Sequence, residues 1–573
     1  MTTRKGLFLH RAAWLLPALA LVTVGLGISA WRERGLSLGD SVYRSVALFD
    51  LGNSMYIGGP GTDWRFQAGR WTGLAVVFGT GFLALGAVLR ERMALAVARK
   101  MRQEVIVIGG TEIATRAYEA ARTAGKSVIW VGAPTLGVGS IRSLAFPWPP
   151  GDRATIVREY AGNAAHVLVA GDDDAATLVL ARAARTTAPS ASITIMMRDA
   201  RLAEEAAATL NQARTRVFSV AAISARALNL KHPPFLIAQN LGQPRIHALI
   251  IGFGQSGQAM ARDLMVNCRT TFLELPAITV IDPHAKALEG VMRVRAPEID
   301  ACAHFTFIEG KICSEAMAPD VATMGGAIAR GGPLTACYVC LTTDTEVLGA
   351  AAMLQSLLRA VDLGRPPFFV RLGDASIVAG TVEEKHGLYA LHAFGDLGSV
   401  LAASEFLSAT PDGAARAFSD AYRASLPAAK RDDPTDRSAR SWDELDETFR
   451  EVNRAVVAHI PAKMASAGID PSLWVGVSLL PRPSQDRQLF ATEAECERLA
   501  ELEHERWAAQ RRMQGWRWTA AKAKDEIRRL HPFLVPYRDL SDEVKEFNRV
   551  YVRETQLACW GTARATDRDH GQH

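Results

Sequence analysis

The feature that most constrains this chain lies between residues 247 and 282. Residues 248–251 are a short apolar run, long enough for one buried strand, and they lead directly into the sequence GFGQSG at residues 252–257. A helical stretch follows at residues 258–266, and a second apolar run ends on Asp282. Strand, glycine turn, helix and strand in this order form the basic unit of a parallel α/β sheet.

The spacing of the three glycines suits a turn that binds phosphate. Gly252 allows a tight turn, Gly254 lets the backbone approach a phosphate, and Gly257 lets the helix pack on the strand. The N–H groups at the start of the helix attract an anion. Asp282 can accept a hydrogen bond from a ribose hydroxyl; it comes later than usual because residues 270–276 lengthen the connection.

This pattern predicts a Rossmann-type lobe that binds NAD(H) or another adenine nucleotide. The alternative is a glycine turn that only packs the helix on the sheet and holds no ligand. The residues predicted to bind the cofactor are Gly252, Phe253, Gly254, Gln255, Ser256, Gly257 and Asp282.

Composition excludes several classes of function. A chain of 573 residues has room for about three or four domains. Its net charge of +5 is small, and without a lysine-rich run we expect no nucleic-acid partner. The seven cysteines all lie at or beyond Cys268, which favours a reducing cytosol over a disulfide scaffold. Cys337 and Cys340 are spaced to point to opposite faces of a strand, so no metal site is predicted.

Two uncharged runs, residues 12–30 and 71–89, have the length that crosses a hydrocarbon core, about 20 residues. A signal peptide is the alternative for the first run, but that run is longer than the apolar region of a typical signal peptide, and a second run follows. Basic residues before the first run and after the second favour cytoplasmic termini. We expect a multi-pass protein of the bacterial inner membrane, with the lipid bilayer as a partner and a large cytoplasmic body.

The loop between the two runs is not a minimal turn. Residues 40–49 have helical spacing, and a glycine-bearing segment with Gly52, Asn53 and Ser54 follows. A span, a short helix, a glycine loop and a second span are the layout of a two-helix pore subunit. The Thr-Val-Gly-Tyr-Gly filter of potassium channels is absent. The alternative is an interfacial amphipathic helix that ties two anchor spans together.

The unit that contains Asp282 has an earlier counterpart. Residues 103–226 and 245–405 show the same succession of strands and helices, which predicts two tandem, doubly wound α/β lobes with parallel sheets. In the first lobe Thr111 and Ala114 replace the second and third glycines, and Gly132 stands in the place of the ribose-binding acid. We therefore expect the first lobe to be mainly structural.

Two spans followed by two such lobes resemble potassium-channel-type proteins that carry RCK (TrkA-N) domains. The acidic positions 172–174 and Asp344, each followed by a helix, are similar to the layout of that family. The resemblance implies lobes that respond to nucleotides or ions, pair with one another and drive a pore for a monovalent cation such as potassium. It also implies a homotetramer with eight lobes.

Residues 441–560 are predicted to form a separate module. A helix at residues 491–513 begins with the spacing of a capping box at Thr492 and Glu495. The pattern Glu503-His504-Glu505-Arg506-Trp507, Gly515-Trp516, His531-Pro532 and Leu534-Val535-Pro536-Tyr537 resembles the bacterial RyR domain, first noted in ryanodine receptors. That resemblance implies a small all-α module that senses a nucleotide-derived ligand and is not catalytic.

Several polar and aromatic residues of this module could offer an aromatic slot with a charged rim for stacking a base. The candidate pocket residues are Glu503, Arg506, Trp507, Gln510, Trp516 and Tyr537. The alternative is that the aromatic residues form the core of the module and that the charged ones form ion pairs on its surface. For His504 we expect a structural hydrogen bond, since no nucleophile is evident beside it.

The sequence thus predicts a multi-domain protein. Its expected parts are two transmembrane helices with a pore-like loop at 1–102, the first lobe at 103–226, a linker at 227–244, the second lobe at 245–405, a flexible linker at 406–440, the RyR domain at 441–560 and a disordered tail at 561–573.

The leading hypothesis for function is a nucleotide-gated inner-membrane cation channel. A non-conducting, membrane-tethered signalling scaffold is the alternative. An NAD(P)-dependent oxidoreductase is disfavoured because no catalytic domain follows the second lobe, so we predict no enzymatic activity and no catalytic residue.

Overall fold

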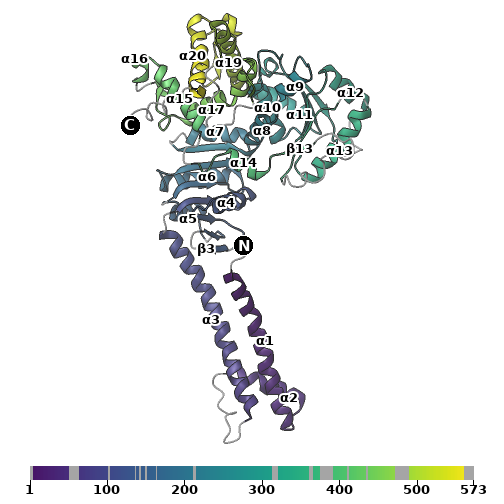
Figure 1. The fold of residues 1–573 in the computed structure, drawn as a ribbon, viewed down its shortest axis with the longest axis vertical. Helices are drawn as coiled ribbons and strands as arrows, with labels where there is room; N and C mark the ends of the chain where they lie inside the picture. The colour runs from purple at the N-terminus through teal and green to yellow at the C-terminus, as the bar shows by residue number, and fades with distance from the viewer. Residues whose placement is uncertain are drawn as a thin grey trace, which may run out of the picture. The chain divides into compact units, whose positions relative to one another are not determined.

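The chain divides into two compact units, Met1–Met101 and Arg102–His573. The computed structural model describes residues 4–50, 63–100, 103–135, 137–140, 143–148, 151–162, 164–210, 214–312, 321–360, 365–373, 391–408, 412–433, 436–471 and 489–560 (Figure 1).

The first unit contains the helices that carry both uncharged runs. Its elements are α1 (Arg4–Glu33), α2 (Leu38–Val46), η1 (Ala47–Phe49) and α3 (Trp64–Lys100). Within the part of the chain that the structure describes, one stretch is long and apolar enough to cross a membrane, Leu15–Glu33 in α1. A second span within α3 therefore stays a prediction. Arg65 at the start of α3 pairs with Glu33 at the end of α1 and joins the two helices.

Helix α2 has its polar side inward and its apolar side outward. Ser41 and Ser45 are fully buried against the rest of the unit. The exposed apolar side chains of this helix are Leu38, Val42, Tyr43 and Val46. This is the reverse of a helix that faces water, and it suits apolar surroundings.

The second unit begins with a seven-stranded sheet. Its strands are β1 (Gln103–Ile108), β2 (Val128–Val131), β3 (Gly137–Ser140), β4 (Ser143–Phe146), β5 (Ala164–Val169), β6 (Ser192–Met197) and β7 (Thr215–Ser219). They lie in the order β3-β4-β2-β1-β5-β6-β7, and every neighbouring pair is parallel except β3 with β4. The helices of this lobe are α4 (Glu112–Thr123), α5 (Arg153–Ala161), α6 (Asp174–Thr187) and α7 (Ala200–Leu210).

The second sheet repeats the first without its antiparallel edge strand. Its strands are β8 (His247–Ile251), β9 (Ala277–Asp282), β10 (His304–Glu309), β11 (Ala336–Val339), β12 (Phe368–Arg371) and β13 (Leu391–Phe394). Their order is β10-β9-β8-β11-β12-β13, all parallel. The helices are α10 (Gln255–Asn267), α11 (Ala285–Arg295), α12 (Val321–Arg330) and α13 (Asp344–Ala360), with the 3-10 turn η3 (Ile299–Ala301). The prediction of two parallel-sheet α/β lobes is confirmed.

One aspartate in each lobe has the same structural role. The Asp174 carboxylate accepts hydrogen bonds from the backbone N–H groups of Arg198 and Asp199, beyond the end of β6. The Asp344 carboxylate accepts one from Gly373, beyond the equivalent strand β12. Each carboxylate ties the start of a helix to the end of the next strand, so in this structure both positions support the backbone.

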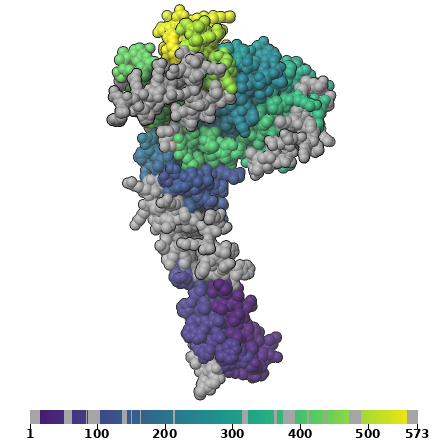
Figure 2. All heavy atoms as spheres, in the orientation of Figure 1, coloured from purple at the N-terminus to yellow at the C-terminus, as the bar shows by residue number. Residues whose placement is uncertain are grey.

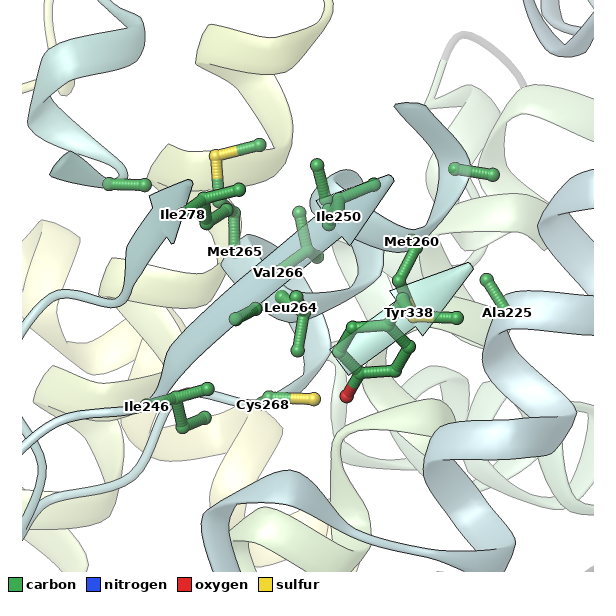
Figure 3. Close-up of a cluster of buried hydrophobic side chains, with 14 of the residues drawn as sticks. Ala225, Ile246, Ile250, Met260, Leu264, Met265, Val266, Cys268, Ile278 and Tyr338 are labelled. Atoms are coloured by element: carbon green, nitrogen blue, oxygen red, sulfur yellow. The ribbon is translucent and has the colours of Figure 1, made fainter. Parts of the chain in front are cut away.

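The last helix of each lobe packs on the other lobe. Helix α8 (Val220–Lys231) follows β7 of the first lobe, yet its Ala225 lies in the core of the second, beside Met260 and Tyr338 (Figure 3). Helix α14 (Leu397–Ala403) follows β13 of the second lobe, yet its Val400 joins the core of the first. Helix α9 (Pro234–Asn240) completes the connection. The two lobes therefore share apolar cores.

Residues 406–440, expected to be a flexible linker, contain ordered helices. They are α15 (Gly413–Ser425), α16 (Ala428–Arg431) and the 3-10 turn η6 (Arg437–Ala439). Phe418 of α15 is fully buried, and its ring lies 5.7 Å from that of Tyr551. The predicted flexibility is wrong for these helices, because a few apolar residues on one face of α15 order a segment whose overall composition is polar.

The C-terminal module is mainly helical. Its elements are α17 (Glu447–Ala458), α18 (Ile460–Ser466), α19 (Glu493–Met513), β14 (Arg517–Trp518), β15 (Leu530–His531), η8 (Tyr537–Asp539) and α20 (Asp542–Trp560). The predicted capping box of α19 is present. The prediction of an all-α module is wrong in one detail, since β14 and β15 form a short parallel ladder that begins after the left-handed Gly515.

Candidate functional site

The glycine turn of the second lobe joins β8 to α10. Gly252 has a positive φ of 85°, which favours glycine, and a Cβ atom on Gly257 would overlap the carbonyl oxygen of Gly252. Gly254 is the N-cap of α10, and no side chain caps the helix there. Among the described residues, apart from its two chain neighbours, no heavy atom lies within 4 Å of where its Cβ would be. The start of α10 is thus accessible at Gly254 and Ser256, whereas Gly252 and Gly257 are tightly packed.

Asp282 is held beside this turn. One carboxylate oxygen accepts a hydrogen bond from the backbone N–H of Phe253 at 2.8 Å, and the other accepts one from His284 at 2.8 Å. Each oxygen keeps a second lone pair for a further donor. The Phe253 side chain is buried and packs edge-on to Phe307 at 5.5 Å. Of Phe253, therefore, only the backbone is placed to serve the predicted site.

Gln255, the first residue of α10, contacts the first lobe. Its Nε2 donates to an Asp199 carboxylate oxygen at 2.8 Å, and its Oε1 accepts from the Ala200 N–H at 3.4 Å. Two turns further along α10, Arg262 pairs with Glu204 of α7. The sequence carried no signal for these contacts, which join lobes through single polar side chains far apart in the chain.

In the first lobe the equivalent place is filled. A Cβ atom on Gly132 would lie 2.7 Å from the indole nitrogen of Trp148, so the position of the ribose-binding acid is occupied by an aromatic ring. The Arg153 guanidinium lies over that ring, 4.9 Å from its centroid. This packing is consistent with a mainly structural first lobe.

In the C-terminal module, Glu503 is the centre of a buried charge network. Its carboxylate lies 2.7 Å from Arg506 and 2.7 Å from Lys463, and the Arg506 guanidinium donates to Gln510 at 2.8 Å. Burial raises the pKa of Glu503, but the two cations more than offset this and lower it to about 2. Burial, and then Lys463, lower the pKa of His459 well below its usual value.

This network overturns the expected roles of three pocket residues. Glu503, Arg506 and Gln510 form neither the rim of a slot nor ion pairs on the surface, because all three are buried. Lys463 lies in α18 and His459 in the turn before it, and no sequence pattern predicts that they meet Glu503.

The aromatic candidates divide into two groups. Trp507 and Trp516 are partly exposed and both contact His531 edge-on, with centroid distances of 5.0 Å and 5.8 Å. The Arg511 guanidinium lies 5.6 Å from the centroid of Trp516, and burial followed by Arg511 lowers the pKa of His531 to about 4. Tyr537 is instead part of the core. Trp507 and Trp516 therefore keep ring surface on which a planar ligand could stack.

His504 makes the structural hydrogen bond that was predicted. Its Nε2 donates to the carbonyl oxygen of Val535 at 2.8 Å, and the ring lies between those of Trp507 and Tyr537.

The C-terminal module lies beside the second lobe (Figure 2), where α19 contacts α10 and η3. The lengthened connection after α10 contributes to this interface. His459 Nε2 donates to the carbonyl oxygen of Arg269 at 3.0 Å, and the N–H of Thr271 donates to Ser466 at 3.1 Å. Ala509 of α19 lies in the same apolar core as α10. The extra residues that delay Asp282 in the sequence therefore carry part of this interface.

A second interface joins the module to the first lobe. The Asp412 carboxylate is shared by Arg216 of β7, at 3.1 Å, and Arg454 of α17, at 2.9 Å. Burial raises the pKa of Asp412, but Arg454 and then Arg216 lower it to about 2. One buried carboxylate thus links the two parts.

The loop between the uncharged runs turns back along α1. Ser45 contacts the α1 backbone at Gly27, and a Cβ atom on Gly73 would lie 2.7 Å from the carbonyl oxygen of Leu48 and 3.3 Å from Thr23. Leu48 therefore lies level with the middle of the apolar stretch of α1. Gly52, Asn53 and Ser54, the predicted pore-loop residues, lie outside the described residues.

Comparison with known proteins identifies one part of the chain. The RyR domain family matches residues 490–562. The match includes α19, both short strands and α20, but not α17 and α18. No curated protein matches.

Among solved structures, the chain is similar to GsuK bound to ADP, with 14% identity and a TM-score of 0.33, over 70% of this chain and 99% of that one. For the GsuK channel bound to NAD the values are 13%, 0.34, 70% and 83%. For the GsuK RCK domain they are 11%, 0.32, 54% and 77%.

Proposed function

We propose that this chain is a membrane-anchored nucleotide sensor that gates a cation channel. The second lobe binds NAD(H) or another adenine nucleotide at residues 252–257 and Asp282. The observation that carries this proposal is the open N-terminus of α10 at Gly254, beside a carboxylate already fixed by the backbone of the same turn.

The chemistry of the turn suits a ligand with phosphate and ribose groups. The N–H groups of the first turn of α10 carry a partial positive charge and offer hydrogen bonds to phosphate oxygens. Asp282 is placed to accept hydrogen bonds from a ribose diol, and its charge disfavours a ribose that carries a phosphate. We therefore assign the site to NAD(H) or a related adenine nucleotide rather than to NADP(H).

Helix α10 would transmit the ligand signal, because it contacts three other parts of the second unit. Gln255 meets α7 of the first lobe, Met260 packs beside α8, and the connection after α10 carries Arg269 under the C-terminal module. A ligand can shift these contacts only by the difference between its affinities for the two arrangements of the lobes. The half-exposed Trp507 and Trp516 offer a second place where a nucleotide-derived ligand could bias the same arrangement.

The membrane unit is proposed to conduct a monovalent cation as a homotetramer with two spans per chain. Its support is the return of α2 and η1 to the middle of the apolar stretch of α1. A helix that ends at that depth leaves backbone carbonyl groups without partners inside the helix, which is tolerated only where protein or a water-filled cavity shields them. A non-conducting scaffold is the alternative, favoured by the absent potassium-filter sequence.

The first test measures nucleotide binding to the purified full-length protein in detergent, using NAD and ADP. Gly254→Asp adds a carboxylate in open space at the helix N-terminus, where Asp is a good N-cap. We expect this variant to fold and to lose nucleotide affinity at least tenfold, while the matched control Gly254→Ala stays within about threefold. Equal affinity in all three proteins would refute the assigned site.

The second test reconstitutes the protein in liposomes loaded with potassium. We expect NAD or ADP to change the potassium flux of the wild-type protein but not of Gly254→Asp. Nucleotide binding without flux at any nucleotide concentration would reject the channel and favour the scaffold.

A further inference from the structure

The residue that faces the open end of α10 belongs to the other lobe. Asp199 precedes α7, and one of its carboxylate oxygens accepts hydrogen bonds from the N–H groups of Arg201 and Leu202, which makes it the N-cap of that helix. Its other oxygen accepts the hydrogen bond from Gln255, the first residue of α10. A single carboxylate therefore lies between the N-termini of two helices.

This carboxylate lies in positive surroundings. Asp199 attracts the guanidinium groups of Arg201 and Arg295, and these two cations repel each other. The N-termini of α7 and α10 add partial positive charges of their own. Asp199 therefore balances positive charge that a ligand anion would otherwise balance.

We propose that Asp199 of the first lobe determines how much negative charge the nucleotide site of the second lobe accepts. The inference rests on the proposed function, since it concerns ligands of the same turn. A phosphate bound at the first turn of α10 would be separated from this carboxylate by the length of the Gln255 side chain and its hydrogen bond to Asp199. That separation is comparable with the screening length of about 8 Å in physiological salt, so the repulsion is felt.

The consequence is a preference among ligands. The bridging pyrophosphate of NAD carries one negative charge on each phosphate, whereas ADP and ATP end in phosphates with more charge. The site should therefore favour NAD over ADP and ADP over ATP. Ligand phosphate and the Gln255–Asp199 contact oppose one another, so tighter phosphate binding loosens the contact between the lobes at this point.

The test compares Asp199→Asn with Glu204→Gln in the full-length protein in detergent. Asparagine removes the charge and keeps the cap on α7 through its Oδ1. Its Nδ2 is a donor, so Gln255 must turn its amide to present Oε1 to it, which gives up the 3.4 Å hydrogen bond from the Ala200 N–H. Glu204 pairs with Arg262 on the same helix pair, two turns away from the glycine turn. Its substitution therefore weakens the lobe contact without changing the charge at the site. The ligands are ATP, ADP, NAD and adenosine, which has no phosphate.

We expect Asp199→Asn to raise the affinity for NAD about threefold and for ATP about tenfold and to leave the affinity for adenosine unchanged. These differences between variant and wild type should disappear in 0.5 M salt. Glu204→Gln should leave the order of affinities unchanged. Equal tightening of all four ligands by both variants would mean that lobe separation, not charge, is responsible, and would overturn the inference. If the wild-type protein binds NAD and Asp199→Asn changes nothing, the inference fails alone; if no protein binds any nucleotide, the proposed function fails with it.

Discussion

Glu503→Gln is expected to loosen the C-terminal module strongly. Glu503 is fully buried between Arg506 and Lys463, so its neutralisation leaves two cations in the interior without a countercharge. Removing one partner of a buried ion pair costs about 3–5 kcal/mol. The fall in the pKa of Glu503 from 4.5 to about 2 corresponds to roughly 3 kcal/mol, which is of the same order.

The assay is hydrogen exchange of the full-length protein in detergent, resolved by peptide. Amides of α19 should exchange roughly 150-fold faster or more in Glu503→Gln, if they open with the module. Amides of β8 in the second lobe provide the internal reference. The matched control is Glu505→Gln on the same helix. The Glu505 side chain is 49% exposed and forms a longer ion pair, 3.7 Å, with Arg269, so this substitution should lower the free energy of unfolding by less than about 1 kcal/mol.

The pH dependence of the stability of the module independently tests whether the Glu503 carboxylate is stabilising. The pKa of Glu503 is lower in the folded protein, so its contribution to stability is present above about pH 4.5 and is lost as pH falls towards 2. Exchange that is no faster in Glu503→Gln than in Glu505→Gln would refute the network as a source of stability.

Three further predictions concern other parts of the second unit. Gly257→Ala should unfold or severely destabilise the second lobe, by more than about 3 kcal/mol, because its Cβ would overlap the Gly252 carbonyl; Gly254→Ala should be tolerated, and thermal unfolding compares the two. Asp412→Asn should remove the ion-pair carboxylate of the buried Arg216 and one of the carboxylates that pair with Arg454, and should speed exchange in β7 and α17 but not in β8. His459 has a pKa below its usual 6.5 in the folded protein, so its contribution to stability is present above about pH 6.5 and is lost as pH falls; exchange in α18, corrected for intrinsic rates, should rise below that pH.

The local elements could be predicted because their signals are local. The glycines at 252 and 257 are dictated by one backbone turn, and the apolar runs beside them make the strands of a parallel sheet. The capping box at Thr492 and Glu495 depends on only four residues. Such features are set by neighbouring side chains and need no knowledge of the remaining chain.

The partners of these elements could not be predicted in the same way. Helices α8 and α14 have ordinary apolar faces, and nothing in their periodicity says that each covers the other lobe. Charged residues on α19 suggest an exposed face, but Glu503 is buried because Lys463, which belongs to a different helix, neutralises it. Asp199 and Gln255 meet through one hydrogen bond, which leaves no pattern in the sequence.

The strength of the Gln255–Asp199 contact sets a limit on the proposed gating. This partly exposed hydrogen bond to a carboxylate is worth on the order of 1 kcal/mol. Moving a two-state equilibrium from 1:99 to 99:1 needs about 5.5 kcal/mol. A ligand that breaks this contact in one chain shifts the equilibrium only about fivefold.

Four chains that change arrangement together approach the required free energy. We therefore expect nucleotide-dependent flux to rise with a Hill coefficient clearly above one, and to lose this steepness when wild-type chains are mixed with an excess of Gly254→Asp chains. A Hill coefficient of one with full gating would mean that each chain responds alone, through contacts stronger than the one between Gln255 and Asp199.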